Sequence, residues 1–484
     1  MTDTVAPSTM PDGIVAVVKH ECETCVSIVP VLAQLRRAGV ELTVYTQDDP
    51  GFPEGFPDVV DDTELRVSWA LDLVTVPTLV RFEGGVEAAR TEGWHRRRWE
   101  ELTGIPGLGR ELPEVRPGCG SRTADPGTVD ELAAQFGSSR LRARRVSLGS
   151  SEDDIEAAFD RGWTDGLPVV PPTETRVLRM LTGTSRRPDE VVAVVPPDLV
   201  ECTVEKVAIN AVMAGCRPEY LPVVLTAVEA TCTDEFNGHG LLATTYFSGP
   251  VVIVNGPIRQ AVGMNSGGNV LGQGNRANAT IGRALQLIVR NVGGGVPGGV
   301  DRATLGNPGK YTFCFAEDEE GSPWESLAVE RGLAPGRSAV TLFAGEGPRG
   351  VIDQLSRRPE SLARSFAGSL RTVGHHKLAL GFDAMLVVSP EHGRVFREAG
   401  WTKARLRDEL LELLTVPGAE LVRGAGGCDE GLPEGLEDAA IPKFRPDGLW
   451  FVHAGGRAGL FSSIIGSWIN GPGGSQPVTR EVVV

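Results

Sequence analysis

Two cysteines near the start of the chain, Cys22 and Cys25, have the C-x-x-C spacing that places two thiols one helical turn apart. At this separation one thiol can resolve a mixed disulfide that the other has formed. Cys22 follows an apolar run typical of a buried strand at 13–20 and opens a helical pattern at 22–39. A helix start presents unpaired N–H groups and a partial positive charge, which favour a thiolate. The spacing therefore predicts a dithiol site that exchanges disulfides.

The elements around these cysteines follow one another regularly. We expect a strand at 13–20, a helix at 22–39, a strand at 40–47, a short helix at 61–72, strands at 75–82 and 84–93 with a Gly-Gly turn, and a helix at 95–104. This β-α-β-α-β-β-α order, with Cys22, Cys25 and a Val-Pro-Thr at Pro77, resembles the thioredoxin family. The resemblance implies a thioredoxin fold over 13–104, with Pro77 in the cis form against the active cysteines.

The cysteine motif departs from that family in two ways. Glu21, preceded by His20, stands where the family has Trp, and Glu23-Thr24 stands where the family has Gly-Pro. Acidic neighbours are expected to raise the thiol pKa and to oppose strong oxidising power. We therefore expect a reductant or a partner-specific relay. The alternative is a redox-inactive unit that serves for docking.

Composition limits the class of protein. The chain has 484 residues, enough for two to four domains, and a formal net charge of −16, which argues against nucleic acid or an anionic membrane as a partner. No apolar run approaches the roughly 20 residues that span a bilayer, and the first residues lack the features of a secretory signal. We expect a cytoplasmic protein. Eight cysteines show no spacing typical of a structural zinc site.

The chain divides by composition. We expect a disordered tail at 1–12, the thioredoxin-like domain at 13–104, a linker or arm rich in Pro, Gly and Arg at 105–149, a Gly/Asn-rich α/β substrate domain at 150–335 and a C-terminal α/β domain at 336–484. Strand and helix patterns alternate in the last region, which favours an α/β module with a mostly parallel sheet. No internal repeat is evident in the sequence.

Several blocks of the larger module resemble a bacterial family, the UGSC (seleno)proteins, some members of which are fused to a thioredoxin-like domain. They include TDGLPVVPPT from Thr164, EKVAINAVMAGCRPEY from Glu205 and AGGRAGLFSSIIGSW from Ala454. The resemblance implies an α/β module with thiol-based chemistry. The motif that names the family, a selenocysteine or cysteine followed by Gly-Ser-Cys, is absent. The nearest string, Cys119-Gly-Ser-Arg in the arm, lacks the last cysteine.

Cys216 is the leading candidate for a catalytic thiol in the larger module. A helical pattern at 204–215 ends at a glycine, and Pro218 fits the first turn of a second helix. Cys216 and Arg217 then lie at the start of this helix, where its dipole and the guanidinium would lower the thiol pKa. The alternative is a buried cysteine that packs at a corner between two helices.

Three further residues are weaker catalytic candidates. Cys314 alternates in a strand pattern at 310–317, which favours a core position over a catalytic one. Glu317 begins a run of acidic residues and could serve as a general base or bind a cation, although such runs usually form solvated loops. His239, which is flanked by glycines, is either a proton-transfer group or a turn-capping residue.

A dense set of amides surrounds the start of a predicted helix near residue 277. Asn265, Asn275 and Asn278, with Arg276, could form an anion site for a carboxylate or phosphate, to which Arg217 could contribute. The alternative is that the asparagines cap the loop. Cys428, in a glycine-rich loop, has no evident partner, and the basic cluster at 375–377 is typical of a surface.

The leading hypothesis is a thiol-dependent oxidoreductase. In it the dithiol domain passes electrons or sulfur equivalents to a cysteine of the larger module, which acts on a small anionic substrate. One alternative is a cysteine-dependent lyase or transferase that acts on a carbon–sulfur or carbon–metal bond and uses a soft metal. Another is a non-enzymatic redox-sensing binding protein. We expect no cofactor beyond the cysteines, a thiol or thioredoxin-reductase-type reductant as partner, and compatibility with a homodimer.

Overall fold

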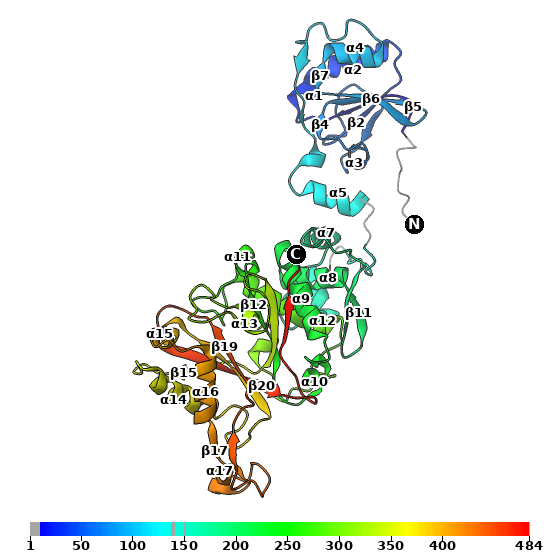
Figure 1. Cartoon of the computed structure of the whole chain (residues 1–484). Coiled ribbons are helices and arrows are strands. Elements are labelled where there is room, and N and C mark those ends of the chain that lie inside the picture. Colours follow the sequence, from blue (N-terminus) through cyan, green and yellow to red (C-terminus); the bar gives the residue numbers. More distant parts are fainter. Residues whose placement is uncertain (1–9, 137–140, 150–151, 484) are drawn as a thin grey trace. The chain divides into compact units, whose positions relative to one another are not determined.

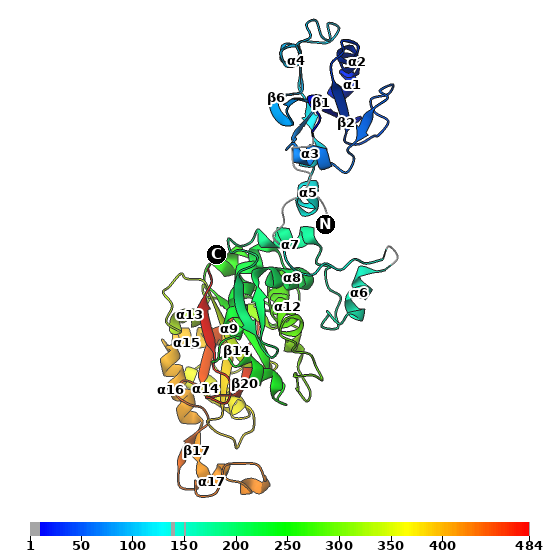
Figure 2. The ribbon, with the colours of Figure 1, turned by 90° about the vertical axis from the view of Figure 1, so that its right-hand side faces the viewer.

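The computed structural model describes residues 10–136, 141–149 and 152–483 (Figures 1 and 2). The chain divides into two compact units, residues 1–139 and 140–484. Both combine helices with β-sheets, which confirms the α/β class. The described helices are all too short or too polar to cross a membrane. Residues 1–9 of the expected tail lie outside the described residues, but Met10 is buried in the first core.

A five-stranded sheet forms the centre of the first unit, in the order β3-β2-β1-β5-β6. Its strands are β1 (Gly13–Val18), β2 (Leu42–Thr46), β3 (Val59–Asp61), β5 (Thr78–Glu83) and β6 (Val86–Glu92). β1, β2 and β3 are parallel, whereas β5 is antiparallel to both β1 and β6. β1 is the central strand and is buried along almost its whole length, as its continuous apolar run predicts.

Four helices accompany this sheet: α1 (Glu23–Ser27), α2 (Val29–Arg37), α3 (Arg66–Ala70) and α4 (Arg96–Thr103). The single helix expected at 22–39 is divided at Ile28. Pro30 explains the division, because it has no N–H group with which to continue the hydrogen-bond ladder of α1. Cys22 is the N-terminal cap of α1 and therefore lies directly between β1 and the helix.

The region expected to be a linker is in part folded onto the first unit. Its elements are β8 (Val115–Arg116), β9 (Cys119–Gly120), η2 (Arg122–Ala124) and α5 (Thr128–Phe136). β8 pairs with β7 (Trp94–His95), and β9 pairs with β4 (Thr75–Val76). Of the expected linker or arm at 105–149, residues 115–124 form the part that pairs with the first unit's strands, and we restrict the name arm to these residues. Residues 137–140 lie outside the described residues.

The second unit contains an eight-stranded sheet whose main path is β13-β12-β14-β20-β16-β19. Its strands are β12 (Gly249–Asn255), β13 (Cys314–Ala316), β14 (Ala339–Gly345), β15 (Arg349–Ile352), β16 (Phe382–Val388), β19 (Leu449–His453), β20 (Phe461–Ile469) and β21 (Val478–Glu481). Only β12–β13 and β16–β19 are parallel pairs, so the expectation of a mostly parallel sheet is wrong. An intervening helix permits a parallel pair but does not require one. The expected boundary between 335 and 336 falls inside this unit.

The second unit also contains twelve helices among its described residues. They are α6 (Asp154–Asp160), α7 (Glu174–Leu181), α8 (Val204–Ala214), α9 (Leu221–Thr231), α10 (Gly238–Ala243), α11 (Ile258–Ala261), α12 (Arg276–Asn291), α13 (Leu327–Glu330), α14 (Pro359–Leu370), α15 (Pro390–Glu398), α16 (Lys403–Leu413) and α17 (Gly418–Leu421). Two small sheets complete the unit, β10 (Val191–Val195) with β11 (Val200–Thr203), and β17 (Thr415–Pro417) with β18 (Ala440–Pro442). The 3₁₀ turns are η3 (Pro218–Tyr220), η4 (Pro308–Lys310) and η5 (Ala425–Gly427).

The large sheet repeats one strand arrangement twice. In each half a strand pairs in parallel with a strand that follows after intervening helices, and pairs antiparallel with a third strand on its other side. The two sets are β12, β13, β14 and β16, β19, β20, and they meet where β14 pairs with β20. The sequence shows no repeat, so this repetition is visible only in the strand topology.

Alternate residues of the strands enter different cores. Val252 of β12 packs with α8, α9 and α12, and Leu386 of β16 packs with α14, α15 and α16. Their neighbours, such as Val251 and Met385, form a third core that joins both halves. The N–H of Asp318, after β13, donates to the carbonyl of His453, at the end of β19, at 2.8 Å. Because β13 and β19 are the two ends of the strand path, the sheet must curl around this third core.

Candidate functional site

The dithiol is built at the junction of β1 and α1. Cys22 has an extended backbone, with φ −107° and ψ 112°, and its sulfur accepts a hydrogen bond from the N–H of Cys25 at 3.3 Å. The Cys22 sulfur also lies 3.6 Å from the carbonyl oxygen of Val76. The Val76–Pro77 peptide bond is cis, as the family resemblance implies. Cys22, Cys25 and Pro77 therefore come together as expected, and both cysteines are free thiols.

The two thiols differ in acidity. Hydrogen bonds lower the pKa of Cys22 to about 5, against the effect of burial; the largest is from the Cys25 side chain, and Cys119 also contributes. Burial raises the pKa of Cys25 well above its ordinary value, and the neighbouring Cys22 adds to this effect. At neutral pH Cys22 is therefore the thiolate and Cys25 is the thiol that stabilises it.

The acidic residues of the motif do not have the expected effect. The N–H groups of His20 and Glu21 donate to the Asp48 carboxylate, at 2.7 and 2.9 Å. Glu23 forms an ion pair with Arg116 at 3.1 Å, and its side chain is 88% exposed. Solvent and the guanidinium screen this carboxylate, so the expectation that acidic neighbours raise the pKa of the first cysteine is wrong.

The arm lies against the cysteine motif. Both residues between the two cysteines contact it, because Glu23 pairs with Arg116 and the Thr24 hydroxyl donates to the carbonyl of Pro117 at 2.7 Å. Cys119 is placed opposite Val76 by the pairing of β9 with β4. A third cysteine thus belongs to the site, although the sequence shows it only as part of a linker.

The dithiol has little access to solvent. Cys22 and Cys25 have no exposed surface, whereas Cys119 is partly exposed. Burial, together with hydrogen bonding to Cys22, raises the pKa of Cys119. Of the three cysteines, only Cys119 has surface that is exposed to solution in this conformation.

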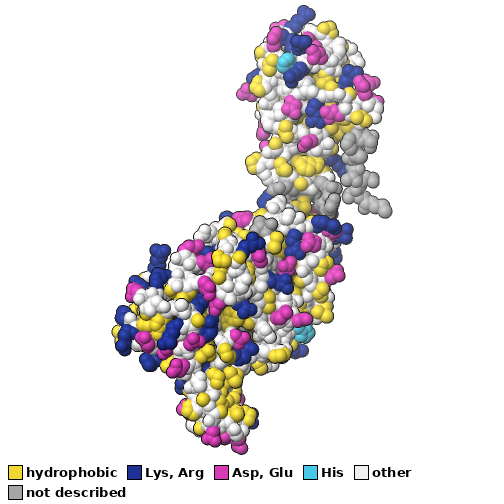
Figure 3. All heavy atoms as spheres, in the orientation of Figure 1, with side chains coloured by type: hydrophobic (Ala, Val, Ile, Leu, Met, Phe, Trp, Pro, Cys, Tyr) yellow, Lys and Arg dark blue, Asp and Glu magenta, His cyan; other side chains and the backbone are white. Residues whose placement is uncertain are grey.

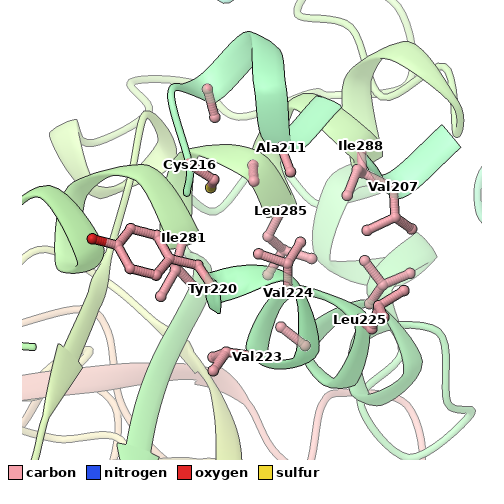
Figure 4. Close-up of a cluster of buried hydrophobic side chains, with 14 of the residues drawn as sticks. Val207, Ala211, Cys216, Tyr220, Val223, Val224, Leu225, Ile281, Leu285 and Ile288 are labelled. Atoms are coloured by element: carbon pink, nitrogen blue, oxygen red, sulfur yellow. The ribbon is translucent and has the colours of Figure 1, made fainter. Parts of the chain in front are cut away.

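Cys216 lies in the principal core of the second unit (Figure 4). Ala211 of α8, Tyr220, Leu285 of α12 and Val224 of α9 are drawn in the same cluster, and the Cys216 thiol donates to the carbonyl of Thr280 at 3.3 Å. Burial raises its pKa to about 12. The expected lowered pKa is wrong because burial outweighs the favourable charge of Arg276.

The other cysteines of the core have the same character. Cys314 is buried on β13, and burial raises its pKa, which agrees with a core position. Cys202 lies on strand β11 and Cys232 caps the end of α9; burial raises the pKa of each to about 12. No resident thiolate is therefore indicated at any of these positions.

The amide set does not form an open anion site. The Asn275 side chain caps α12 by accepting from the N–H of Asn278 at 3.0 Å. Asn265 and Asn278 bond to each other through backbone and side chain, at 3.0 and 2.9 Å. Arg276 donates through Nε to the carbonyl of Gly215 at 2.9 Å. Because these bonds hold the loop itself, the loop-capping alternative fits better.

Arg217 and His239 bond to none of the other candidate residues in the described part of the chain. Arg217 is exposed, with its guanidinium 3.9 Å from the Glu219 carboxylate. His239 is exposed on α10. Basic and acidic side chains are interspersed over the face of the molecule that Figure 3 shows, so no broad basic patch replaces these candidates there.

Glu317 belongs to a second group of polar residues, at the carboxyl ends of three strands. It is fully buried; its carboxylate accepts from Asn255 Nδ2 at 2.6 Å and from the N–H of Leu327 at 2.7 Å, and burial raises its pKa. His453 is also buried, and burial lowers its pKa. This edge is where ligands of α/β sheets commonly bind.

Three buried atoms near this edge have no hydrogen-bond partner among the described residues: Asn255 Oδ1, Ser389 Oγ and His453 Nε2. Such atoms in a folded protein call for a water or a ligand. Sequence reasoning missed these residues. Asn255 and His453 each end a strand and Ser389 directly follows one, and polar residues after apolar runs are the signal that could have found them.

One group of the described residues could hold a metal ion: His375, His376 and Cys428, whose ligand atoms lie within 4.8 Å of one another. The Cys428 sulfur is 3.8 Å from His375 Nε2. The N–H of Lys377 donates to His375 Nδ1 at 3.2 Å, so the ring proton is on Nε2 and faces the sulfur. Because a metal at Nε2 would break this arrangement, the residues fit a hydrogen-bonded Cys–His pair better than a metal site.

Comparison of the chain with protein-family models, with curated proteins and with solved structures gives no match.

Proposed function

We propose that the chain is a thiol–disulfide oxidoreductase in which Cys22 and Cys25 of the first unit are the reacting dithiol. One observation carries the proposal: the Cys22 sulfur, bonded by the N–H of Cys25 at 3.3 Å, has a pKa lowered to about 5 beside a second thiol. A stable thiolate with a resolving thiol one turn away is the arrangement that disulfide exchange requires. The strand order around Cys22 supports the proposed relation to the thioredoxin family.

The acidity of Cys22 supports a direction of electron flow. A lowered pKa stabilises the reduced dithiol, and this makes its disulfide easier to reduce. The Cys22–Cys25 disulfide is then an oxidant towards substrate thiols, in contrast to the reductant that the acidic motif predicts. Cys216 of the second unit takes no part in this exchange, because its thiol is buried and protonated at neutral pH. We also propose that the second unit is related to the UGSC family.

The proposal is tested by redox titration of the full chain in glutathione buffers. Peptide mapping without reduction should find a reversible Cys22–Cys25 disulfide, with a midpoint more positive than the roughly −270 mV of thioredoxin. A Cys428→Ser chain is the matched control and should titrate like the native chain, because Cys428 lies in the other unit. Failure to form the Cys22–Cys25 disulfide reversibly would refute the proposal.

A further inference from the structure

Cys119 reaches the dithiol through backbone pairing. The arm pairs antiparallel with the two residues before Pro77, with Cys119 opposite Val76 and Gly120 opposite Thr75. The Cys22 sulfur lies 3.6 Å from the carbonyl oxygen of the same Val76. The two cysteines therefore flank one residue of β4, although they are far apart in the sequence.

The chain has features that hold the arm at this position. Gly118 fits because a Cβ there would lie 2.4 Å from Thr75 Cγ2 and 2.8 Å from the carbonyl oxygen of Val76. Ser121, directly after the pair, is fully buried; its N–H donates to the carbonyl of Val74 at 3.0 Å and its hydroxyl accepts from Gln47 Nε2 at 2.7 Å. The contacts of Glu23 and Thr24 add to these. Cys119 is thus fixed beside Cys22 by bonds on both sides of it.

Burial separates the roles of the three thiols. Cys22 and Cys25 have no exposed surface, and Cys119 is partly exposed. Cys119 therefore offers surface to a thiol in solution in this conformation, whereas Cys22 offers none. We propose that Cys119 is the exchange thiol of this site, which forms a disulfide with Cys22 and passes the oxidation on to an external thiol. This inference rests on the proposed function.

The exchange is balanced without any further reactant. In the oxidised chain the Cys119 thiolate attacks the Cys22 sulfur; the Cys22–Cys119 bond forms, the Cys22–Cys25 bond breaks, and Cys25 takes up the proton that Cys119 lost. An external thiolate then attacks Cys119, and Cys22 leaves as a thiolate. A second external thiolate attacks the external sulfur of this mixed disulfide and releases Cys119. Two external thiols thereby lose two electrons and two protons and form one disulfide. Cys22 and Cys25 gain the two electrons, Cys25 takes up one proton, and the other proton passes to solvent because Cys22 remains a thiolate.

The second step of the exchange, in which an external thiolate attacks Cys119, agrees with the acidities. A thiol of lower pKa leaves faster from a disulfide. Cys22 has the lowest pKa of the three, so it is the better leaving group when an external thiolate attacks the Cys22–Cys119 bond. The same property makes Cys119, rather than Cys22, the sulfur that stays bound to the external thiol.

The decisive experiment traps the proposed disulfide. The full chain with Cys25→Ser, reduced and then treated with oxidised glutathione, should yield a Cys22–Cys119 disulfide in non-reduced peptide maps, with release of two glutathione thiols. A stable glutathione adduct on Cys22, with Cys119 as a free thiol, would overturn the inference. The native chain in the same buffer tests the proposed function separately, because its Cys22–Cys25 disulfide does not need Cys119.

A kinetic test uses Cys119→Ser in the full chain. Serine keeps a hydroxyl that can bond the Cys22 sulfur, so a merely supporting role of Cys119 would be retained. We expect the midpoint of the Cys22–Cys25 pair to stay near the native value, while reduction of the disulfide by glutathione becomes at least ~10-fold slower. The Cys428→Ser chain should keep the native rate. An unchanged rate in Cys119→Ser would overturn the inference.

Discussion

Cysteines of the two units occupy opposite environments. In the first unit, hydrogen bonds from Cys25 and Cys119 lower the pKa of the Cys22 thiol to about 5. In the second unit Cys202, Cys216 and Cys232 are surrounded by apolar side chains, and burial raises the pKa of each to about 12. Cys22 is no more exposed than these residues. The difference therefore lies in the hydrogen bonds that reach each sulfur, and not in its burial.

The largest expected effect is the loss of exchange on removal of the thiolate. Cys22→Ser should abolish disulfide formation in the first unit, because no other thiol there has a lowered pKa. Thiol titration with peptide mapping measures this directly. Cys202→Ser should leave the Cys22–Cys25 disulfide intact; equal loss in both variants would remove the distinction between the two units.

The pH dependence of stability sharpens the comparison. The pKa of Cys22 is lowered in the folded chain from 9.0 to about 5, so its contribution to stability is fully present above pH 9 and is lost as the pH falls through 5. Between these values the free energy of unfolding of the reduced first unit should rise with pH by up to about 1.4 kcal/mol per unit from this group. Hydrogen exchange of β1 in the native and Cys22→Ser chains, compared at each pH, measures the difference. Parallel pH profiles would contradict the lowered pKa.

An intermediate effect is expected where the arm approaches β4. Gly118→Ala places a Cβ 2.4 Å from Thr75 Cγ2 and should destabilise the docked arm by about 1–3 kcal/mol, as overpacking does. Exposure of Cys22 to alkylating reagents should then increase. Gly120→Ala is the matched control, because a Cβ at Gly120 meets nothing within 4 Å. Equal alkylation of the two variants would show that the arm does not cover Cys22.

The smallest effect on redox chemistry is expected at Cys216. Cys216→Ala removes a small buried side chain and should lower the free energy of unfolding by about 1 kcal/mol, without any change in the rate of disulfide exchange. Chemical denaturation and the glutathione assay measure the two quantities. A slower exchange in this variant would revive Cys216 as a redox partner of the first unit.

Local patterns in the sequence were sufficient for the first unit's sheet and dithiol. The apolar run of β1 and the helical spacing after Cys22 fix the backbone, and the C-x-x-C spacing then brings the two sulfurs together without help from distant residues. The start and end of α8 and the start of α12 are equally local, and the sequence predicts all three.

The remaining features depend on contacts that a local pattern does not encode. β9 has two residues, too few for any periodicity, and its place beside β4 follows from the close fit of Gly118 and the bonds of Ser121. Cys216 was placed correctly after α8, but its acidity is set by the packing of α12 against it. The direction of the strands of the large sheet likewise depends on which strands become neighbours, and alternation along the chain leaves that open.

The position of Cys119 also has a consequence for chain entropy. A Cys22–Cys25 disulfide closes a ring so small that it barely restricts the unfolded chain, whereas a Cys22–Cys119 disulfide would close a loop that contains every strand of the five-stranded sheet except β1. For a loop of about 100 residues the chain-entropy account gives roughly 4.7 kcal/mol of stabilisation. Exchange between the two disulfides would thus alternate the first unit between a tethered and an untethered form, distinguishable by their resistance to proteolysis.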